Sequence, residues 1–222
     1  MEAEEFLRNF IPSGLPKVTY LLYEIHWGRG HRRWRYWCRN IHPKHAEIIF
    51  LKDEEIHDRP NIPCKITWFL PWTPCGACAH EIIEFLEEHP NVTLDIRAAQ
   101  VYRPHDRRNR RGLRALAEKG VQISIMNISD YQYCWNMFVD HQGINYMLPR
   151  YFLYSIWLNS LQLHSVLKSL RQKIQPKTFI SSDYLYCWRT FVVPQKNGED
   201  YWPWHFFPKI ISCSQQLCSI LE

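Results

Sequence analysis

The sequence predicts an α/β fold, in which a mixed five-stranded sheet is flanked by helices and followed by a C-terminal helical extension. Segments rich in β-branched and aromatic residues alternate along the chain with segments of helical periodicity. This alternation is typical of helices that cover both faces of one sheet. The length of 222 residues suits one domain with a sizeable core and an appendage.

The first part of the sheet is predicted to be a hairpin followed by a buried strand. Residues 18–27 (VTYLLYEIHW) predict a strand, and residues 32–38 predict its partner after a turn at 28–30. These two strands are expected to pair antiparallel. Residues 45–53 (HAEIIFLKD) predict a short helix, and residues 65–70 (KITWFL) predict a strand in the core.

The second part alternates helices and strands, so its strands can run parallel. The expected strands are 92–101 and 121–126. The expected helices are 75–89, 106–119 and 151–173. A further helix is expected to be capped by Ser129 or Asp130 and to run to Val139. Pro74 and Pro90 mark the start and the end of the first helix, and Gly120 ends the second.

One internal repeat is present. Residues 129–139 (SDYQYCWNMFV) recur as residues 182–192 (SDYLYCWRTFV), with eight of eleven positions identical. Two copies are too few for a solenoid, which needs at least three. We therefore expect three parts: an N-terminal extension at 1–17, a main domain at 18–172, and a C-terminal extension at 173–222 that repeats one helix.

Positive charge is concentrated rather than spread along the chain. The net charge is +5, and residues 26–44 contain six basic residues and no acidic one. Residues 102–114 contain six arginines and a single acidic residue. Concentrated positive charge favours an anionic polymer as a partner, and a solubilising surface is the alternative interpretation.

The eight cysteines could indicate disulfides, but the rest of the sequence favours a reducing compartment. The N-terminal residues lack the apolar core of a secretory signal. No run of about 20 apolar residues is present, so we expect no membrane span. We expect a cytoplasmic and/or nuclear protein, in which closely spaced cysteines predict a metal site or a redox motif.

Two short motifs carry metal-binding residues. The first is His45-Ala46-Glu47, and the second is Pro74-Cys75-Gly76-Ala77-Cys78, which begins 29 residues after His45. One histidine and two cysteines supply three zinc ligands and leave the fourth position open, as in catalytic sites. The sequence therefore predicts one Zn²⁺ per chain, held by His45, Cys75 and Cys78.

The third residue of the first motif predicts acid–base chemistry. Glu47 lies two residues after His45, so it can reach an attacking water without ligating the metal. A carboxylate there can take a proton from water and deliver it to a ring nitrogen and a leaving amine. A redox dithiol is the main alternative for Cys75 and Cys78. The two motifs in this order, however, form the signature of zinc nucleobase deaminases.

These motifs resemble those of the AID/APOBEC polynucleotide cytidine deaminases, over about residues 18–139. The resemblance includes ITWFLPWTPCGAC at 66–78, RAAQVY at 97–102 and VQISIM at 121–126. LLYEIHWG at 21–28 and HDRRNRRGLR at 105–114 are most similar to the apolipoprotein-B mRNA-editing branch. The resemblance implies the cytidine deaminase fold and a hydrolase that converts cytosine to uracil in single-stranded RNA and/or DNA. We also expect a homodimer or an RNA-binding auxiliary protein as a partner.

The resemblance also implies a set of substrate contacts. Trp72 matches a pocket wall, Tyr102 an aromatic ring that packs on the flipped base, and Asn40 a contact to the target sugar. Thr73 stands where serine is usual, and the loop from Arg103 to Asp106 matches the segment that reads the base 5′ to the target. Four residues depart from the family pattern: Pro71, Gln100, Arg103 and Pro104.

Two other functions remain open at this point. An enzyme for free cytidine or its nucleotides would use the same chemistry, although it would not need the arginine-rich segments. A catalytically silent zinc protein that binds nucleic acid would need the three ligands, although it would have no use for Glu47.

Overall fold

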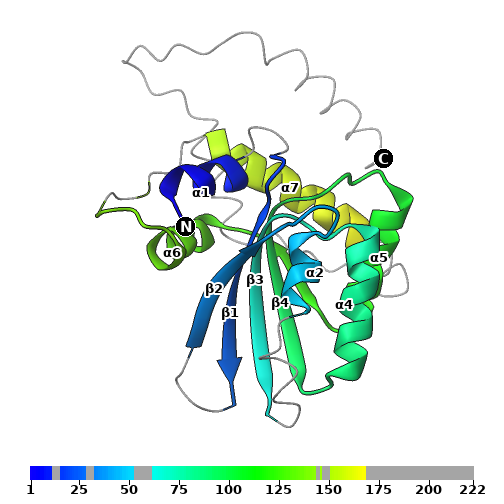
Figure 1. Ribbon diagram of the computed structural model, residues 1–222. Helices are drawn as coiled ribbons and strands as arrows, with labels where there is room; N and C mark the ends of the chain where they lie inside the picture. Colours follow the sequence, from blue (N-terminus) through cyan, green and yellow to red (C-terminus); the bar gives the residue numbers. More distant parts are fainter. Residues whose placement is uncertain (12–15, 29–32, 53–61, 144–145, 147–150, 169–222) are drawn as a thin grey trace, which may run out of the picture. The chain divides into compact units, whose positions relative to one another are not determined.

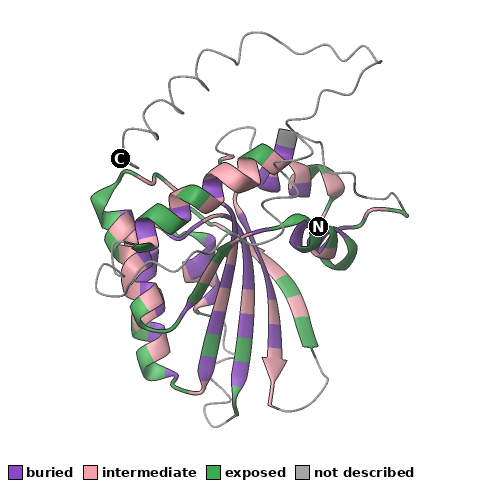
Figure 2. Cartoon of the chain, turned by 180° about the vertical axis from the view of Figure 1, so that it is seen from behind, coloured by how far each residue is buried: buried purple, intermediate pink, exposed green. Residues whose placement is uncertain are grey.

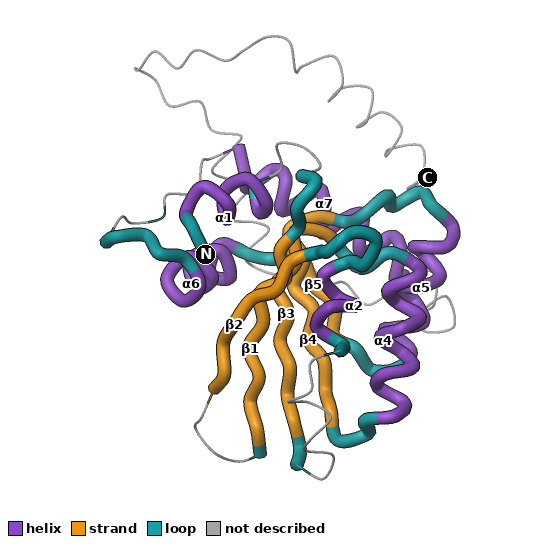
Figure 3. The backbone as a smooth tube through the Cα atoms, viewed as in Figure 1, coloured by secondary structure: helices purple, strands orange, loops and turns teal. Residues whose placement is uncertain are grey.

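The computed structural model describes residues 1–11, 16–28, 33–52, 62–143, 146 and 151–168. Within them, five strands form one sheet in the order β2-β1-β3-β4-β5 (Figures 1 and 3). The strands are β1 (Tyr20–Trp27), β2 (Arg33–Arg39), β3 (Cys64–Trp72), β4 (Val92–Gln100) and β5 (Gln122–Ile125). The helices are α1 (Ala3–Phe10), α2 (Ala46–Phe50), α4 (Gly76–Glu88), α5 (Arg107–Glu118), α6 (Ile128–Phe138) and α7 (Tyr151–Lys168).

The sheet is mixed, as the sequence predicts. Strand β1 pairs antiparallel with β2 and with β3, whereas β3–β4 and β4–β5 are parallel pairs. The register places Tyr23 opposite Tyr36 on one side and opposite Trp68 on the other. Because β3 and β4 are parallel, their carboxyl ends meet at one edge of the sheet, where Trp72 pairs with Gln100.

Helices cover both faces of the sheet, and successive strand residues belong to the core clusters on opposite faces. Figure 2 shows buried and more exposed residues alternating along strands of the sheet. On the first face, α2, α4, α5 and the later turns of α7 pack on residues such as Tyr23, Trp68 and Ile96. On the second face, α1, α6 and the first turn of α7 pack on Leu22 and Phe69. This alternation is the physical basis of the strand patterns in the sequence.

Three details differ from the sequence predictions. Helix α1, which was not predicted, lies inside the expected N-terminal extension, and its Phe6 and Phe10 are fully buried on the second face. Helix α2 is shorter than 45–53. The cap of α6 is Asn127, so the prediction of Ser129 or Asp130 was wrong.

Asn127 caps α6 because it forms a capping box with Asp130. The Asn127 side chain accepts a hydrogen bond from the Asp130 N–H at 3.0 Å, and the Asp130 carboxylate accepts one from the Asn127 N–H at 2.9 Å. Ser129 instead donates its hydroxyl to Asn127. The second repeat copy, the proposed C-terminal extension and residues 169–173 of the last expected helix lie outside the described residues.

None of the helices that the structure describes combines the length and apolar character that a membrane span requires.

Two glycines allow α4 and α5 to approach closely. A Cβ on Gly112 would lie 2.8 Å from the Cβ of Ala79 and 3.1 Å from the Cα of Gly76. A Cβ on Gly76 would lie 2.8 Å from the carbonyl oxygen of Arg108. These separations are shorter than real carbon contacts, so any larger residue would push the two helices apart.

We expect Gly112→Ala to destabilise the protein by about 1–3 kcal/mol, because the added methyl group overpacks the contact between α4 and α5. In an exposed helix the same change would stabilise by up to about 1 kcal/mol. The sign of the effect therefore tests the contact. Thermal and denaturant unfolding measure it, and a raised melting temperature would contradict this interpretation.

Candidate metal centre and active site

The three residues predicted to bind zinc come together at the beginnings of two helices. His45 is the N-cap residue of α2, and Cys75 is the N-cap residue of α4, with Cys78 in the first turn that follows. Their ligand atoms all lie within 4.8 Å of one another. The Nδ1 atom of His45 is 3.3 Å from the Sγ atom of Cys78 and 3.7 Å from that of Cys75.

These distances fit a tetrahedral zinc ion. Typical Zn–N bonds of ~2.05 Å and Zn–S bonds of ~2.3 Å place the nitrogen and sulfur ligands about 3.6 Å apart. The two observed separations of 3.3 and 3.7 Å lie on either side of this value. The donor set of one imidazole and two thiols also suits zinc. Within the described residues the group comprises three ligands, so a fourth position is left for a water or substrate.

The two thiols differ in acidity. The hydrogen bond from the Cys78 thiol, together with the backbone N–H groups of Cys78 and Ala77, lowers the pKa of Cys75 to about 5. The same thiol pair raises the pKa of Cys78, and burial and the nearby Glu47 raise it further. One thiolate is thus present at neutral pH, and a metal must displace the proton from the second thiol.

Glu47 lies beside this group in the first turn of α2. Its side chain is only 8% exposed, and burial raises the pKa of its carboxyl, while its own backbone N–H and His45 act in the opposite direction. It also lies within hydrogen-bond reach of the Cys78 thiol. A raised pKa makes a carboxyl group better suited both to accept and to return a proton, so this placement supports the predicted acid–base role.

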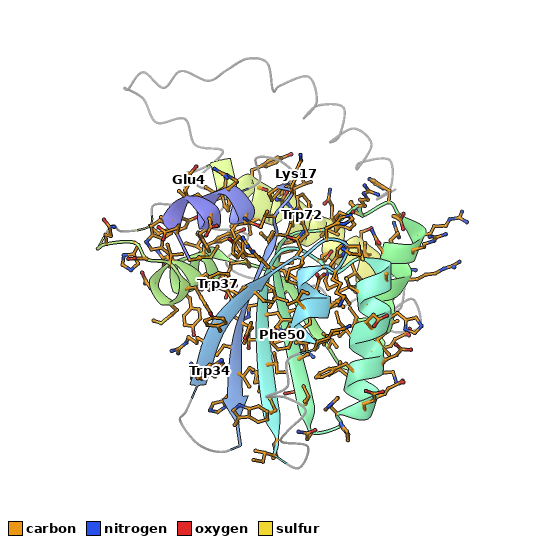
Figure 4. The ribbon with its side chains drawn as sticks, viewed as in Figure 1. Glu4, Lys17, Trp34, Trp37, Phe50 and Trp72 are labelled. Carbon is orange, nitrogen blue, oxygen red and sulfur yellow. The ribbon has the colours of Figure 1, made fainter. Side chains whose placement is uncertain are left out.

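Two aromatic side chains border the site at the carboxyl ends of β3 and β4. Trp72, labelled in Figure 4, makes an edge-to-face contact with Tyr102, with ring centroids 6.3 Å apart. The Nε1 atom of Trp72 is buried and finds no acceptor among the described residues. A buried donor without a partner is costly, so it is a candidate for a contact with a bound molecule.

Thr73 fixes the position of Tyr102. Its side chain is buried, and its hydroxyl accepts a hydrogen bond from the Tyr102 N–H at 3.0 Å. The backbone N–H of Thr73 in turn donates to the carbonyl of Gln100 at 2.9 Å. The Thr73 hydroxyl, a group that serine would also supply, therefore positions Tyr102 in the fold. Its contact with substrate remains a prediction.

Asn109, which was not among the predicted site residues, connects the metal-binding loop to Tyr102. Its buried side chain accepts a hydrogen bond from the Gly76 N–H at 2.9 Å and donates one to the Tyr102 carbonyl at 3.3 Å. The available sequence signal is that Asn109 is the one uncharged residue in the run RRNRR at 107–111. Such an interruption of an exposed basic run indicates a position that faces inward.

Comparison with known proteins agrees with this geometry. A family model described as APOBEC4-like AID/APOBEC deaminase matches residues 9–141. The chain belongs to the AID/APOBEC deaminase family. The resemblance that the sequence motifs predicted is therefore confirmed, and so is the deaminase fold.

Relatives in this family resemble most of the chain. The "C->U-editing enzyme APOBEC-1" of Mus musculus is 44% identical over 82% of this chain and 83% of its own length. That of Homo sapiens is 40% identical over 77% of this chain and 73% of its own length. The "DNA dC->dU-editing enzyme APOBEC-3Ca" of Felis catus is 46% identical over 48% of this chain and 57% of its own length. The APOBEC-1 relatives agree with the branch expected from the sequence.

In this AID/APOBEC chain, the predicted specificity loop begins with a strained residue. Arg103 has a φ angle of +41°, in the left-handed region that non-glycine residues rarely adopt. Its guanidinium lies over the ring of Tyr102, 5.3 Å from the centroid. The exposed Arg103 side chain is thus held beside the Tyr102 ring, and this position supports its predicted contact with substrate.

The other predicted contacts have structural partners of their own. Asp106 is the N-cap of α5 and accepts hydrogen bonds from the N–H groups of Arg108 at 2.8 Å and Asn109 at 3.1 Å. Asn40 accepts from the Thr19 N–H at 2.8 Å and donates to the Lys17 carbonyl at 3.0 Å. Both therefore hold backbone segments in place, and their substrate contacts remain predictions.

We expect Asp106→Ala to lower the melting temperature and Asp106→Asn to lower it less, because asparagine also caps helices. The two N–H groups hold the pKa of Asp106 below its ordinary value. Its contribution is therefore present above that ordinary value, near 3.8, and is lost as the pH falls through the lowered pKa. Melting curves from pH 7 to pH 2 measure this effect. Equal losses for the two variants at pH 7 would contradict the capping role.

Proposed function

We propose that this chain catalyses the zinc-dependent hydrolytic deamination of cytosine to uracil in single-stranded RNA or DNA. The observation that carries the proposal is the three-ligand group of His45, Cys75 and Cys78 with buried Glu47 beside it. The names of the relatives describe C->U editing and DNA dC->dU editing, which are the two forms of this reaction.

The proposed cofactor is one Zn²⁺ per chain. When bound, zinc supplies Lewis acidity and lowers the pKa of a water molecule to about 7. The support for this stoichiometry is that the described residues hold a single group of suitable ligands. Metal analysis of the purified protein would test it.

The chain's own residues would move the protons and hold the base. Glu47 takes a proton from the water that attacks C4 of cytosine and passes it to the ring nitrogen N3. Glu47 then transfers the second proton of that water to the exocyclic amine, which leaves as ammonia, so that cytosine and water give uracil and ammonia. Trp72 and Tyr102 would enclose the base, which must be unstacked to enter.

A stripe of arginines on α5 favours a polymer over a free nucleoside. Arg107, Arg110, Arg111 and Arg114 together line a hollow of about 230 Å³. Helix α5 begins directly after Asp106, at the end of the loop that Tyr102 opens, so this stripe follows Tyr102 closely along the chain. Contacts with phosphates would supply affinity there without reading sequence.

We expect Glu47→Ala to abolish turnover and to retain zinc, because Glu47 is not one of the ligands. The matched control is Glu81→Ala, which removes an exposed carboxylate from α4. Deamination of RNA and DNA oligonucleotides and of free cytidine should be measured beside metal content. Turnover of free cytidine alone would contradict the polymer substrate, and activity in Glu47→Ala would contradict the mechanism. A wild type that is inert on every substrate would favour the silent zinc protein.

We expect the double variant Arg110→Ala/Arg111→Ala to bind oligonucleotides more weakly and with a smaller salt dependence. Each lost phosphate contact should reduce the slope of log K against log salt by about 0.7. Arg8→Ala on α1 is a suitable control, because that exposed side chain pairs with Glu4. Titrations at several salt concentrations measure the slope. An unchanged slope would mean that these arginines do not contact the bound oligonucleotide.

We also propose a protein partner, a second copy of the chain or an RNA-binding auxiliary protein, for the edge strand β2. Trp34 and Tyr36 on this strand are 51% and 56% exposed and line an apolar hollow with Phe50.

For the location of the protein we propose the cytoplasm and/or the nucleus, which would keep the zinc-binding thiols reduced. None of the five cysteines that the structure describes forms a disulfide bond.

A further inference from the structure

Helix α6 binds the second face of the sheet through a well-defined set of side chains. Tyr131, Cys134, Trp135, Phe138 and Val139 are buried there among Phe6, Leu22 and Phe69. Asp130 pairs with Arg97 of β4 at 2.5 Å, and the Tyr133 hydroxyl is hydrogen-bonded to Glu24 and Arg35. Seven side chains of α6 and its C-cap thus make the contacts with the rest of the fold.

The repeat preserves all seven of these residues. Their counterparts in the second copy are Asp183, Tyr184, Tyr186, Cys187, Trp188, Phe191 and Val192. The two copies differ at three positions, where Gln132, Asn136 and Met137 correspond to Leu185, Arg189 and Thr190. At each of these positions the residue of the first copy is exposed. Residues 182–192 lie outside the described residues, so this comparison uses their sequence alone. The second copy therefore keeps all seven of these residue types and changes only residues that are exposed in the first copy.

The likeness continues into α7. Residues 149–167 match residues 203–221 at eight of nineteen positions, and buried Phe152 and Leu163 correspond to Phe206 and Leu217. One buried contact is lost: the Asn159 side chain, which accepts from the Val101 N–H at 2.9 Å, corresponds to Cys213. The duplicated sequence therefore covers the residues of α6 and α7, but only its α6 part preserves every residue type of the contact set.

We propose that residues 182–192 are a second α6, which docks on the same sheet face of the same chain when residues 129–139 leave it. The connection is long enough. Residues 169–181, thirteen in number, can span about 45 Å when extended. The eighteen residues of α7, which lead away from α6, cover about 27 Å. The linker can therefore return the second copy to the position of the first while α7 stays in place.

The first copy remains the preferred occupant. Three residues, Met126, Asn127 and Ile128, separate it from β5, whereas the second copy must close a thirteen-residue linker, which costs roughly a factor of ten. The capping residue Asn127 also has no counterpart, since Ile180 stands in its place. An exchange replaces the solvent-facing Gln132, Asn136 and Met137 by Leu185, Arg189 and Thr190. The protein would then show a different surface, with one more positive charge, on an unchanged core.

A double-mutant cycle in the full chain tests the exchange, with Trp135→Ala and Trp188→Ala as equivalent changes in the two copies. Loss of a buried tryptophan in a chain without a substitute costs a factor of roughly a hundred to a few thousand in the folding equilibrium. We expect Trp188→Ala to change nothing and Trp135→Ala to cost about a factor of fifty, because the second copy takes over with a linker cost of about tenfold and a missing cap worth about fivefold. The double variant should show the full loss. A loss for Trp135→Ala equal to that of the double variant would overturn the proposal.

A second measurement identifies the docked segment. Asp183→Ala should leave the melting temperature of the wild type unchanged and lower it in the Trp135→Ala background, where Asp183 replaces Asp130 as the partner of Arg97. The same effect of Asp183→Ala in both backgrounds would overturn the proposal. Melting temperatures should not depend on protein concentration, whereas a rescue that disappears on dilution would place the second copy on another chain and contradict exchange within one chain. These readouts require no deaminase activity.

Discussion

The close contact between α4 and α5 is the constraint on which the site depends. Gly76 and Gly112 leave no room for a side chain between the helices, and Asn109 of α5 binds the backbone at Gly76, directly after Cys75. The position of the Cys75 and Cys78 ligands is thereby set by packing against α5, a helix that supplies none of the three ligands. A catalytic zinc site needs this kind of support, because its three ligands must be held in place without a fourth protein ligand.

The same contact couples the metal group to the base-binding side. Asn109 also binds the carbonyl of Tyr102, and Thr73 at the end of β3 binds the N–H of the same residue. Tyr102 is thus held from both sides of its backbone, and its ring meets Trp72. Folds of the α/β class commonly bind ligands at the carboxyl ends of parallel strands, which is where these residues lie. Here a few hydrogen bonds fix the loop of the two cysteine ligands relative to the aromatic ring of Tyr102.

The sequence predicted what depends on periodicity and missed what depends on distant partners. The strands were predictable because residues such as Tyr23 and Leu22 alternate between two buried faces. Helix α1 was not, because its eight residues gain stability from Trp135, which lies far along the chain. The zinc ligands were predictable because their spacing is set by chemistry, and the structure brings them together. Asn109 was missed because its role exists only once Gly76 and Tyr102 are brought beside it.

The two faces of the sheet place different demands on the chain. On the first face, the packing of α2, α4 and α5 also positions the metal group, so a change there affects both stability and chemistry. On the second face, α6 contacts the sheet through apolar side chains, one ion pair and one hydroxyl, and these lie apart from the three ligands. A duplicate of α6 can therefore diverge at its exposed positions without affecting the site. The pattern of identity between residues 129–139 and 182–192 is what such a division predicts, because contacts with the sheet constrain seven positions and solvent constrains the others very little.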